Sequence, residues 1–318
     1  MKVLFLVQAE QRAILDRLYE GIAAHCDCDI RWLTDAEQAD LKGYFRAQVD
    51  VQAYDRILFF LRFKKEIRQA RFIRRVPNLV ILEHDAYQNY IPGKYQGRFS
   101  RHYRRLPGAR VINSGYGVVR RLREEGVDAV FVAKGYDQAL LRDLQGVRDI
   151  ELGFVGSLKS GVYSERKAFL ETLSQVEPLQ AMRTNSGDDY LNALNRIRFF
   201  VSADIGMGEY MIKNFEAMAC GCVLFAYDQG EEENRALGFV DMQNIVLYGS
   251  LEEFRDKLGR LRADPALAER VAEAGRQLVE SRFSFAELGR QIVEAMRPAL
   301  RERPRESFWQ RLLGRFVR

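Results

Sequence analysis

The chain has 318 residues, of which 47% are hydrophobic and 29% charged, with 24 Gly and 7 Pro. This is a globular composition, and it excludes collagen-like, low-complexity and disordered classes of protein. The net charge of +5 is unevenly distributed: residues 1–148 carry 26 Lys+Arg against 18 Asp+Glu, residues 149–296 carry 16 against 24, and residues 297–318 carry seven Arg against two Glu. The length and this charge split predict two domains and a basic tail, with an anionic ligand or surface facing the first half and the tail.

In the first half, short apolar runs alternate with segments of helical periodicity. Strands are predicted at 2–8, 29–33, 56–61, 78–83, 109–112 and 129–132, and helices around 15–22, 35–47, 63–75 and 115–125. A loop rich in Tyr and Gly covers 86–99. Such alternation is typical of a doubly wound parallel sheet.

The same alternation restarts at residue 150 and continues to the end of the second half. Strands are predicted at 150–155, 179–183, 197–202, 222–226 and 244–248, and helices at 163–176, 187–195, 211–219, 250–263, 265–280 and 284–299. The fold class is therefore α/β with two Rossmann-like, doubly wound domains facing across a cleft. We expect domains at 1–148 and 149–296, followed by a basic amphipathic tail at 297–318.

Neither a membrane span nor a signal peptide is expected, because the apolar runs are too short and an acid follows the first run at Glu10. The protein is therefore expected to be cytoplasmic. The cysteines form two C-x-C pairs, Cys26/Cys28 and Cys220/Cys222, which lie far apart in the sequence. Zinc sites show wider ligand spacing and closer partners, so reduced thiols are expected and no metal site.

Ligands of doubly wound sheets bind beyond the carboxyl ends of the strands. In the second half this rule selects Gly156, Ser157, Lys159, Arg166, Thr184, Asn185, the loop 203–210 and Met211. In the first half it selects Gln8 to Gln11, His84, Asp85 and Asn113 to Tyr116.

The most informative segment is 206–222, which starts with the glycines Gly206 and Gly208 and continues into a helix. Glycines allow a ligand to approach the backbone, and the free amides of a helix N-terminus bind anions. Lys213 and Glu216 lie three residues apart and share one helix face. A solvated Lys–Glu pair on an ordinary helix explains the same pattern. No dinucleotide or ATP-type phosphate loop is present.

The segment Phe215-Glu216-Ala217-Met218-Ala219-Cys220-Gly221-Cys222 resembles the "(L/F)EAMACG" segment of GT-B nucleotide-sugar glycosyltransferases of the "glycosyl transferases group one" set, which includes family four and spore-maturation-like proteins. Three more segments are similar in order and spacing: 152–157 with Arg166, 132–137, and 283–285. The resemblance covers about residues 110–295.

The resemblance implies a sugar-donor site in the second half. Glu216 would bind the ribose hydroxyls, since a carboxylate accepts two hydrogen bonds at once. Arg166, Lys213 and the backbone amides of 206–212 would neutralise the leaving diphosphate. Together with the strand-end positions, the predicted sugar-donor residues are Gly156, Ser157, Arg166, Thr184, Asn185, Gly208, Tyr210, Met211, Lys213 and Glu216. No metal is implied, and the sugar donor is expected to be a UDP- or dTDP-sugar.

One position departs from the family pattern. Family four members carry an acid eight residues before the ribose-binding Glu, where this chain has Gly208. Glu209, one residue later, is the candidate for contact with the donor sugar. The shift leaves open both that role and the retaining stereochemistry that the family implies.

In the first half, His84 and Asp85 follow a strong strand and are candidates for the acceptor base. A histidine that only satisfies a turn explains the position equally well. His102, within Arg101-His102-Tyr103-Arg104-Arg105, is interpreted as part of a basic patch, and His25 receives no role.

The tail combines Phe308, Trp309, Leu312 and Phe316 with several arginines, which favours contact with an anionic membrane over packing on the first domain. The sequence therefore predicts a glycosyltransferase that acts on a lipid-linked or lipopolysaccharide-type acceptor at the inner face of the cytoplasmic membrane. A GT-B nucleotide-sugar 2-epimerase and a nucleic-acid-binding protein are the alternatives. The acidic second half and the lack of a nucleic-acid-binding motif count against the second of these.

Overall fold

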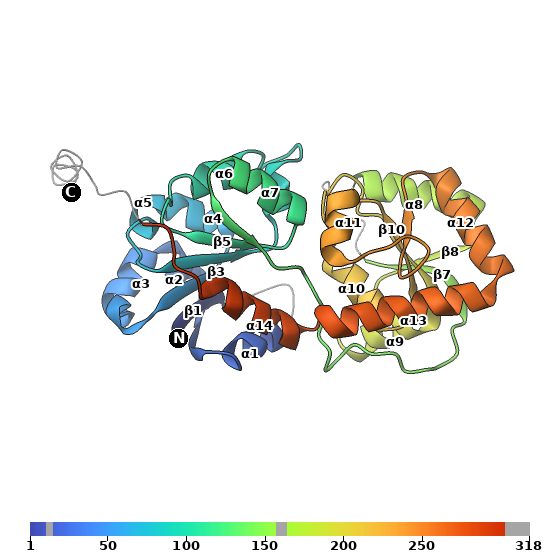
Figure 1. The fold of residues 1–318 in the computed structure, drawn as a ribbon, viewed down its shortest axis with the longest axis horizontal. Helices are drawn as coiled ribbons and strands as arrows, with labels where there is room; N and C mark the ends of the chain where they lie inside the picture. The colour runs from blue at the N-terminus through green and yellow to red at the C-terminus, as the bar shows by residue number, and fades with distance from the viewer. Residues whose placement is uncertain (11–14, 157–163, 303–318) are drawn as a thin grey trace.

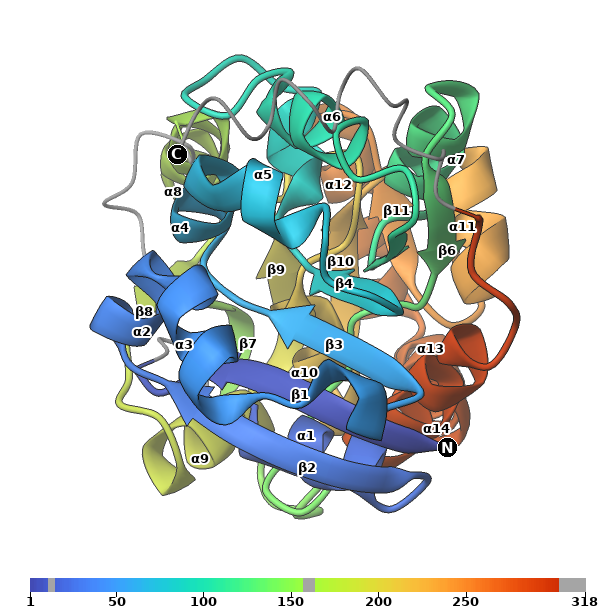
Figure 2. The same ribbon diagram turned by 90° about the vertical axis from the view of Figure 1, so that its left-hand side faces the viewer.

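The computed structural model describes residues 1–10, 15–156 and 164–302. It contains two parallel sheets, one in each half of the chain, which lie side by side along the long axis of the molecule (Figure 1). Figure 2 shows the first sheet in front of the second. The expected α/β architecture of two doubly wound sheets is confirmed.

The first sheet has six strands in the order β2-β1-β3-β4-β5-β6, with every neighbouring pair parallel. The strands are β1 (Lys2–Gln8), β2 (Asp27–Leu33), β3 (Arg56–Phe60), β4 (Leu79–Glu83), β5 (Arg110–Asn113) and β6 (Asp128–Phe131). The helices are α1 (Asp16–Ala23), α2 (Asp35–Ala39), α3 (Leu41–Gln48), α4 (Phe63–Glu66), α5 (Ala70–Ile73), α6 (Arg98–Tyr103) and α7 (Tyr116–Glu124), and short 3₁₀ turns lie at η1 (Val51–Ala53), η2 (Ile67–Gln69) and η3 (Ala86–Asn89). The helix predicted over 63–75 is therefore interrupted at η2.

The second sheet has five strands in the order β11-β10-β9-β7-β8, again all parallel. They are β7 (Ile150–Val155), β8 (Leu179–Met182), β9 (Ile197–Ser202), β10 (Val223–Tyr227) and β11 (Val246–Tyr248). The helices are α8 (Ser164–Val176), α9 (Asp188–Arg196), α10 (Ile212–Ala219), α11 (Glu231–Leu237), α12 (Leu251–Ala263), α13 (Pro265–Arg282) and α14 (Phe285–Met296). The sequence analysis did not predict α11.

The last helix, α14, returns to the first sheet and packs on α1 (Figure 1). Its final carbonyl groups are bound by two arginines of the first sheet: Arg56 donates to Met296 O at 2.7 Å, and Arg110 donates to Ala295 O at 3.1 Å. Cations at a helix C-terminus satisfy its unpaired carbonyls and complement its dipole. We therefore use "first domain" for the six-stranded sheet with α1–α7 and α14, and "second domain" for the five-stranded sheet with α8–α13.

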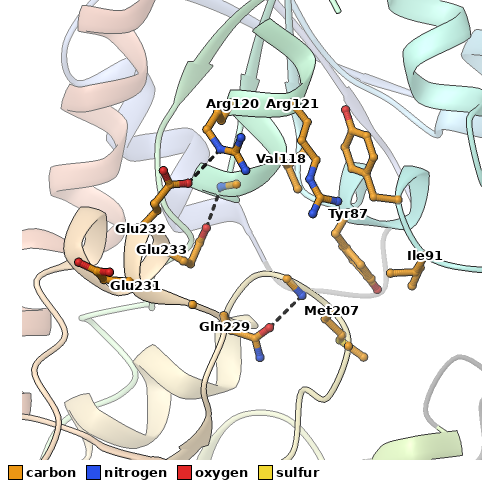
Figure 3. Close-up of a pocket in the computed structure, with 15 residues that line it drawn as sticks. Tyr87, Ile91, Val118, Arg120, Arg121, Met207, Gln229, Glu231, Glu232 and Glu233 are labelled. Carbon is orange, nitrogen blue, oxygen red and sulfur yellow. Dashed lines mark hydrogen bonds and ion pairs between the residues drawn. The ribbon is translucent and has the colours of Figure 1, made fainter. Parts of the chain in front are cut away.

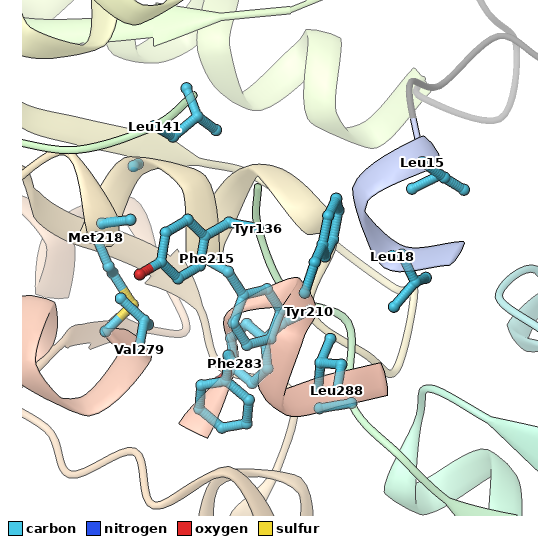
Figure 4. Close-up of a cluster of buried hydrophobic side chains, with 14 of the residues drawn as sticks. Leu15, Leu18, Tyr136, Leu141, Tyr210, Phe215, Met218, Val279, Phe283 and Leu288 are labelled. Carbon is cyan, nitrogen blue, oxygen red and sulfur yellow. The ribbon is translucent and has the colours of Figure 1, made fainter. Parts of the chain in front are cut away.

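The two domains share one hydrophobic core (Figure 4). Tyr136, on the segment that leaves the first domain, pairs with the chain that returns to it: its amide donates to Phe283 O at 3.0 Å, and its carbonyl accepts from Phe285 N at 2.9 Å. The ring of Phe283 packs on Phe215 of α10, with centroids 5.1 Å apart. One hydrophobic cluster therefore extends from the first domain through the two connecting segments into the second domain.

In each sheet there is one point, the topological switch point, at which the strand order reverses. Strand order reverses between β1 and β3 in the first domain and between β7 and β9 in the second. Ligands of such sheets bind beyond the carboxyl ends of the strands at these points. The loops after these strands are therefore where a site is expected.

Candidate functional site

A cavity of about 710 Å³ lies between the domains, beyond the carboxyl ends of both sheets. Its lining includes five of the predicted catalytic and sugar-donor residues, His84, Asp85, Arg166, Met211 and Lys213, and three further residues from the predicted strand-end positions, Gln8, Glu10 and Asp204. The structure therefore brings the two predicted halves of the site, which lie far apart in the sequence, to the walls of one cavity. We call this cavity the cleft.

Asp204 organises the second-domain wall of the cleft. It follows β9 and is 3% exposed. Its Oδ2 accepts hydrogen bonds from Met211 N at 3.2 Å and from Asn214 Nδ2 at 2.8 Å, so it fixes the start of α10. Its Oδ1 forms an ion pair with Arg166. Asp204 lies in the loop 203–210 that the sequence rule selected, but its own role was not predicted, although an acid two residues after a buried strand was available as a signal.

Arg166 comes from the first turns of α8 and is largely buried. Its guanidinium pairs with Asp204 and donates to the carbonyl of Ala203 at 3.3 Å. The same side chain lines the cleft beside Met211 and Lys213. Arg166 therefore supplies positive charge where α10 begins, while Asp204 balances part of that charge.

Lys213 and Glu216 lie on one face of α10, as predicted, and Tyr190 of α9 connects them. The hydroxyl of Tyr190 donates to Glu216 Oε2 at 2.5 Å, and Lys213 Nζ donates to the same hydroxyl at 3.4 Å. Burial raises the pKa of Glu216, while Lys213 and Tyr190 lower it. Burial also lowers the pKa of Lys213, and Glu216 opposes this change. Glu216 lies next to the cleft rather than in its wall.

The loop between β9 and α10 contains the two predicted glycines in the left-handed region, Gly206 at φ 73° and Gly208 at φ 69°. The amide of Gly208 donates to Gln229 Oε1 at 2.8 Å. Glycine adopts positive φ without a steric penalty, which explains its presence here. Gly208 is exposed on this loop, in the wall of a second cavity described below.

Glu209 does not face the cleft. Its side chain is completely buried, its Oε1 forms an ion pair with Lys134, and its Oε2 accepts from Ser114 Oγ at 3.3 Å. Both partners belong to the first domain and its exit segment. The predicted contact of Glu209 with the donor sugar is not supported by this arrangement, because both carboxylate oxygens already have protein partners.

Tyr210 is also directed inward. It is 2% exposed and lies within the hydrophobic cluster of Figure 4. Its hydroxyl donates to Asn234 Oδ1 at 2.5 Å, and its ring packs on Phe239. Its side chain therefore serves the core rather than a ligand. Gly156 directly follows β7, whereas Ser157 and Lys159 lie outside the described residues. Thr184 and Asn185 follow β8 but do not line the cleft.

On the first-domain wall, His84 and Asp85 follow β4. His84 is half-buried, and its ring packs edge-on against Phe60 with centroids 5.2 Å apart. Burial, together with the charge of Lys134, lowers the pKa of His84 to about 3, so its ring is neutral near pH 7. Asp85 is exposed, and its amide donates to the buried Glu83 Oε1 at 2.7 Å.

The interpretation of His102 as part of a basic patch is wrong. His102 is 2% exposed, and its Nε2 lies 2.7 Å from Oε1 of the equally buried Glu66. The pair lies beneath an aromatic wall of the cleft, where Phe63 stacks on Phe99 with centroids 3.6 Å apart and Tyr95 packs on both.

All four cysteines have free thiols, and within the described ranges no cluster of His, Cys, Asp and Glu could hold a metal ion.

A second, smaller cavity of about 350 Å³ lies between α7 and α11, on the far side of the 206–208 loop (Figure 3). Two contacts join the domains here: Arg120 pairs with Glu232 at 2.9 Å, and Glu233 Oε2 accepts from Gly117 N at 2.9 Å. Burial raises the pKa of Glu233 to about 7, while the Gly117 amide opposes this rise.

None of the helices in the described part of the chain is both long enough and apolar enough to cross a membrane. The predicted amphipathic tail cannot be compared with the structure, because residues 303–318 lie outside the described ranges. Just before them, Arg301 donates to Gly126 O of the first domain at 2.5 Å.

Comparison with known proteins identifies the family. A family model described as "Glycosyl transferase-like" matches residues 134–294, about half of the chain. No curated protein matches the sequence.

Among solved structures, HepE of Anabaena aligns with a TM-score of 0.68 at 15% identity, over 93% of this chain and 99% of that one. Sucrose-phosphate synthase from Thermosynechococcus elongatus aligns with a TM-score of 0.65 at 12% identity, over 93% and 98%. A glycosyltransferase from Rickettsia africae aligns with a TM-score of 0.62 at 12% identity, over 93% and 97%. At sequence identities this low, the similarity shows the fold alone. It confirms the predicted GT-B architecture.

Proposed function

Because the chain belongs to the glycosyl transferase-like family, and is therefore a glycosyltransferase, we propose that it transfers a hexose from a nucleoside diphosphate sugar to a lipid-linked or lipopolysaccharide-type saccharide. One observation carries the proposal: the amino end of α10, with Lys213 and Arg166, faces His84 and Asp85 across a single cleft. A cationic helix terminus on one wall and polar acceptor-side groups on the other suit transfer between two bound substrates.

The second domain supplies the sugar-donor half of the site. The free amides at the start of α10 bind the diphosphate, as helix N-termini bind anions, and Lys213 and Arg166 add positive charge where the leaving group develops negative charge. Glu216 accepts hydrogen bonds from the ribose hydroxyls, with Tyr190 orienting its carboxylate. The sequence predicts domains at 1–148 and 149–296 with 297–318 as the tail; because α14 packs on the first domain, we assign the sugar-donor role to residues 149–284 and the acceptor role to residues 1–148 together with α14.

The proposed sugar donor carries uracil or thymine. HepE of Anabaena was crystallised with UDP-glucose, which supports a UDP-hexose here. No metal ion takes part in the proposal, since Arg166, Lys213 and the α10 amides provide the charge that a cation would otherwise supply. Chelation with EDTA is therefore expected to leave turnover unchanged.

On the acceptor side, Asp85 is the proposed base, with His84 neutral beside it. A pKa of about 3 makes the imidazole of His84 a weak proton acceptor near neutral pH. Asp85 is exposed at the cleft. Replacing Asp85 by Asn should lower kcat about 10²–10⁴-fold with little change in the affinity for the sugar donor, whereas His84→Gln should have a smaller effect. A loss confined to the affinity for the sugar donor would contradict the assignment of the base.

Two features support an acceptor with an apolar part. The first-domain wall of the cleft is aromatic, with Phe63, Tyr95 and Phe99 packed together. The segment 63–105, which carries this wall, also carries exposed arginines, namely Arg68, Arg71, Arg74, Arg75, Arg98, Arg101, Arg104 and Arg105. An apolar wall beside a cationic surface suits a lipid-linked substrate at the inner face of the cytoplasmic membrane, where anionic headgroups attract cations.

A thermal-shift panel of UDP, dTDP, GDP and CMP with their sugars tests the sugar-donor assignment. A true ligand at a hundredfold excess over its Kd should stabilise the protein by about 2.7 kcal/mol. Glu216→Ala and Arg166→Ala should abolish both this shift and transfer. Lys213→Ala should weaken nucleoside diphosphate binding more than nucleoside binding.

Product analysis separates the proposal from its alternatives. A glycoside formed on a saccharide acceptor supports transfer, and the anomeric configuration of that product shows whether transfer retains or inverts. A 2-epimeric sugar formed without an acceptor would support an epimerase instead. Salt-dependent binding to plain DNA, with no response to any nucleotide sugar, would contradict both enzyme assignments.

A further inference from the structure

Lys134 occupies the segment that carries the chain from the first domain to the second. It is 7% exposed, yet it lines the cleft together with His84 and Met211. Its Nζ lies 5.8 Å from the ring centre of Tyr87 and 3.9 Å from Met211 Sδ. The ammonium group therefore stands at the junction of the two domains, next to both walls of the site.

The partner of Lys134 is Glu209, which comes from the second domain and is completely buried. The first domain makes room for this carboxylate at Gly115, where a Cβ atom would lie only 2.5 Å from Glu209 Oε2. Ser114 adds a hydrogen bond to the same oxygen. A buried carboxylate is unfavourable without a compensating charge, so the position of Glu209 depends on Lys134.

Glu209 lies within the loop that leads to α10. Several contacts fix this loop on its own domain, among them Gly208 N to Gln229, Tyr210 to Asn234, and Met211 N to Asp204. The ion pair between Glu209 and Lys134 fixes the same loop on the opposite domain. The position of the amino end of α10 relative to His84 thus depends on this ion pair, to which each of the two domains contributes one residue.

We propose that Lys134 is a positioning residue which, through Glu209, holds the 206–211 loop and the amino end of α10 in register with the acceptor wall. The inference rests on the proposed function for its catalytic consequence. It assigns Glu209 to the alignment of the domains rather than to contact with sugar. Lys134 also acts on His84 through its charge, but burial is the larger cause of the low pKa of that ring, so the loss of kcat on removal of Lys134 should be carried by Glu209.

A double-mutant cycle tests this coupling. Lys134→Met should lower kcat about 10²-fold, because a displacement near 1 Å costs that much in transfer between bound substrates. Glu209→Gln should lower kcat by a similar factor. If the two residues act as one unit, the double variant should also be about 10²-fold slower, whereas independent effects would multiply to about 10⁴-fold. Multiplicative losses would overturn the proposal.

Two further readouts separate positioning from simple loss of stability. Nucleoside diphosphate affinity should change less than about threefold in Lys134→Met, because Asp204 and Gln229 still hold the loop on the second domain. Lys134→Arg, which keeps the charge, should recover turnover to within about tenfold of the wild type. Loss of kcat and affinity in equal measure, with no rescue by Arg, would assign Lys134 a structural role instead.

The exposed pair Arg120–Glu232 is the matched control, because it joins the same two domains (Figure 3). Its side chains are 46% and 56% exposed, and exposed pairs contribute little. Arg120→Met, Glu232→Gln and their combination should each change kcat less than about twofold. A loss as large as that of Lys134→Met would show that any domain contact matters equally, and would overturn the specific role of Lys134.

Hydrogen exchange tests the inference independently of turnover. Amides of residues 206–210 should exchange at least tenfold faster in Lys134→Met than in the wild type, while amides of β9 should be unchanged. If the wild-type protein neither binds nor turns over a nucleotide sugar, the proposed function fails, and this exchange experiment still decides the positioning role. Unchanged exchange in the loop would overturn it.

Discussion

The hydroxyl of Tyr190 donates a 2.5 Å hydrogen bond to Oε2 of Glu216, so a side chain of α9 orients the carboxylate of α10. Lys213 Nζ lies 4.6 Å from the ring centre of the same tyrosine. Tyr190 therefore stands between the cation proposed for the diphosphate and the carboxylate proposed for the ribose. Burial and the nearby Glu216 raise the pKa of Tyr190 well above its usual range, so the hydroxyl remains a hydrogen-bond donor.

Tyr190→Phe should weaken binding of the sugar donor while the fold is kept. A hydrogen bond to a charged group contributes about 1.5–3 kcal/mol, which corresponds to a loss of roughly 10- to 100-fold in affinity. Calorimetric titration with UDP measures this loss. Tyr227→Phe, in the same domain but packed on Tyr248, is the control and should bind as the wild type does. Equal affinities for Tyr190→Phe and the wild type would contradict the proposed role.

Asp204→Ala should both destabilise the protein and remove binding of the sugar donor. The change leaves Arg166 buried without its carboxylate and releases the start of α10. Breaking a buried ion pair costs about 3–5 kcal/mol, which urea unfolding can measure. Asp256→Asn on the exposed face of α12 should stay within about 0.5 kcal/mol of the wild type. Unaltered stability of Asp204→Ala would show that Asp204 does not organise the wall.

The strands and helices of the second-domain wall of the cleft could be predicted from the sequence, but the contacts between their side chains could not. Strand and helix periodicity placed β7, β9 and α10 within one or two residues, because each strand is an apolar, buried run interrupted by a single charged residue. The pairing of Glu209 with Lys134 could not be predicted, because spacing within a motif cannot show that a lysine 75 positions away takes up the carboxylate. Tyr190 and Asp204 belong to no motif, so only the packing of α9 and β9 reveals their roles.

The predictions for the charge-rich segments were wrong for a different reason. His102 stands among arginines, yet it turns inward to Glu66, while Arg101, Arg104 and Arg105 remain exposed. A short helix such as α6 has too few residues for its buried face to be recognised among so many charges. The prediction of one helix over 63–75 was wrong for the same reason. Among so many basic residues, the sequence pattern gives no sign of the 3₁₀ turn at η2.

Glu233→Gln should alter how stability depends on pH. The pKa of Glu233 rises from 4.5 to about 7 on folding, so between these values the folded state holds a proton that the unfolded state releases. Stability from this group therefore falls as pH rises from about 4.5 to about 7, by about 3 kcal/mol. The difference in unfolding free energy, Gln variant minus wild type, should increase by that amount over the same range.

Chemical unfolding at pH 5 and pH 7.5 measures this difference. The groups that act on Glu233 are the amides of Gly117 and Tyr116, which favour its charged form, together with Lys134 and the repelling Glu209. A flat difference for Glu233→Gln would show that its carboxyl titrates as it does in the unfolded chain.

The exposed arginines of α6 and of the turn that follows it should bind the protein to anionic membranes. Replacing Arg98, Arg101 and Arg105 by Ser removes three cations from the face beside the aromatic wall. Each cation near an anionic leaflet contributes about 1 kcal/mol, so the triple variant should lose about 3 kcal/mol, or roughly 150-fold, in affinity for vesicles containing phosphatidylserine. Cosedimentation at low salt measures this loss, and raising the ionic strength should reduce wild-type binding in the same way.

The matched control for this membrane surface removes three exposed arginines from the second domain, Arg235, Arg260 and Arg270, and leaves the first domain intact. The net charge then falls by the same three units, but we expect vesicle affinity to change less than about threefold, because the proposed contact lies on the first domain. Deleting residues 304–318 provides the second comparison. If only that deletion lowers binding, the tail carries the membrane contact and α6 does not; if the two triple variants lose affinity equally, binding follows net charge and no oriented surface exists. UDP affinity should stay unchanged in all three proteins, since none of the changes touches α10.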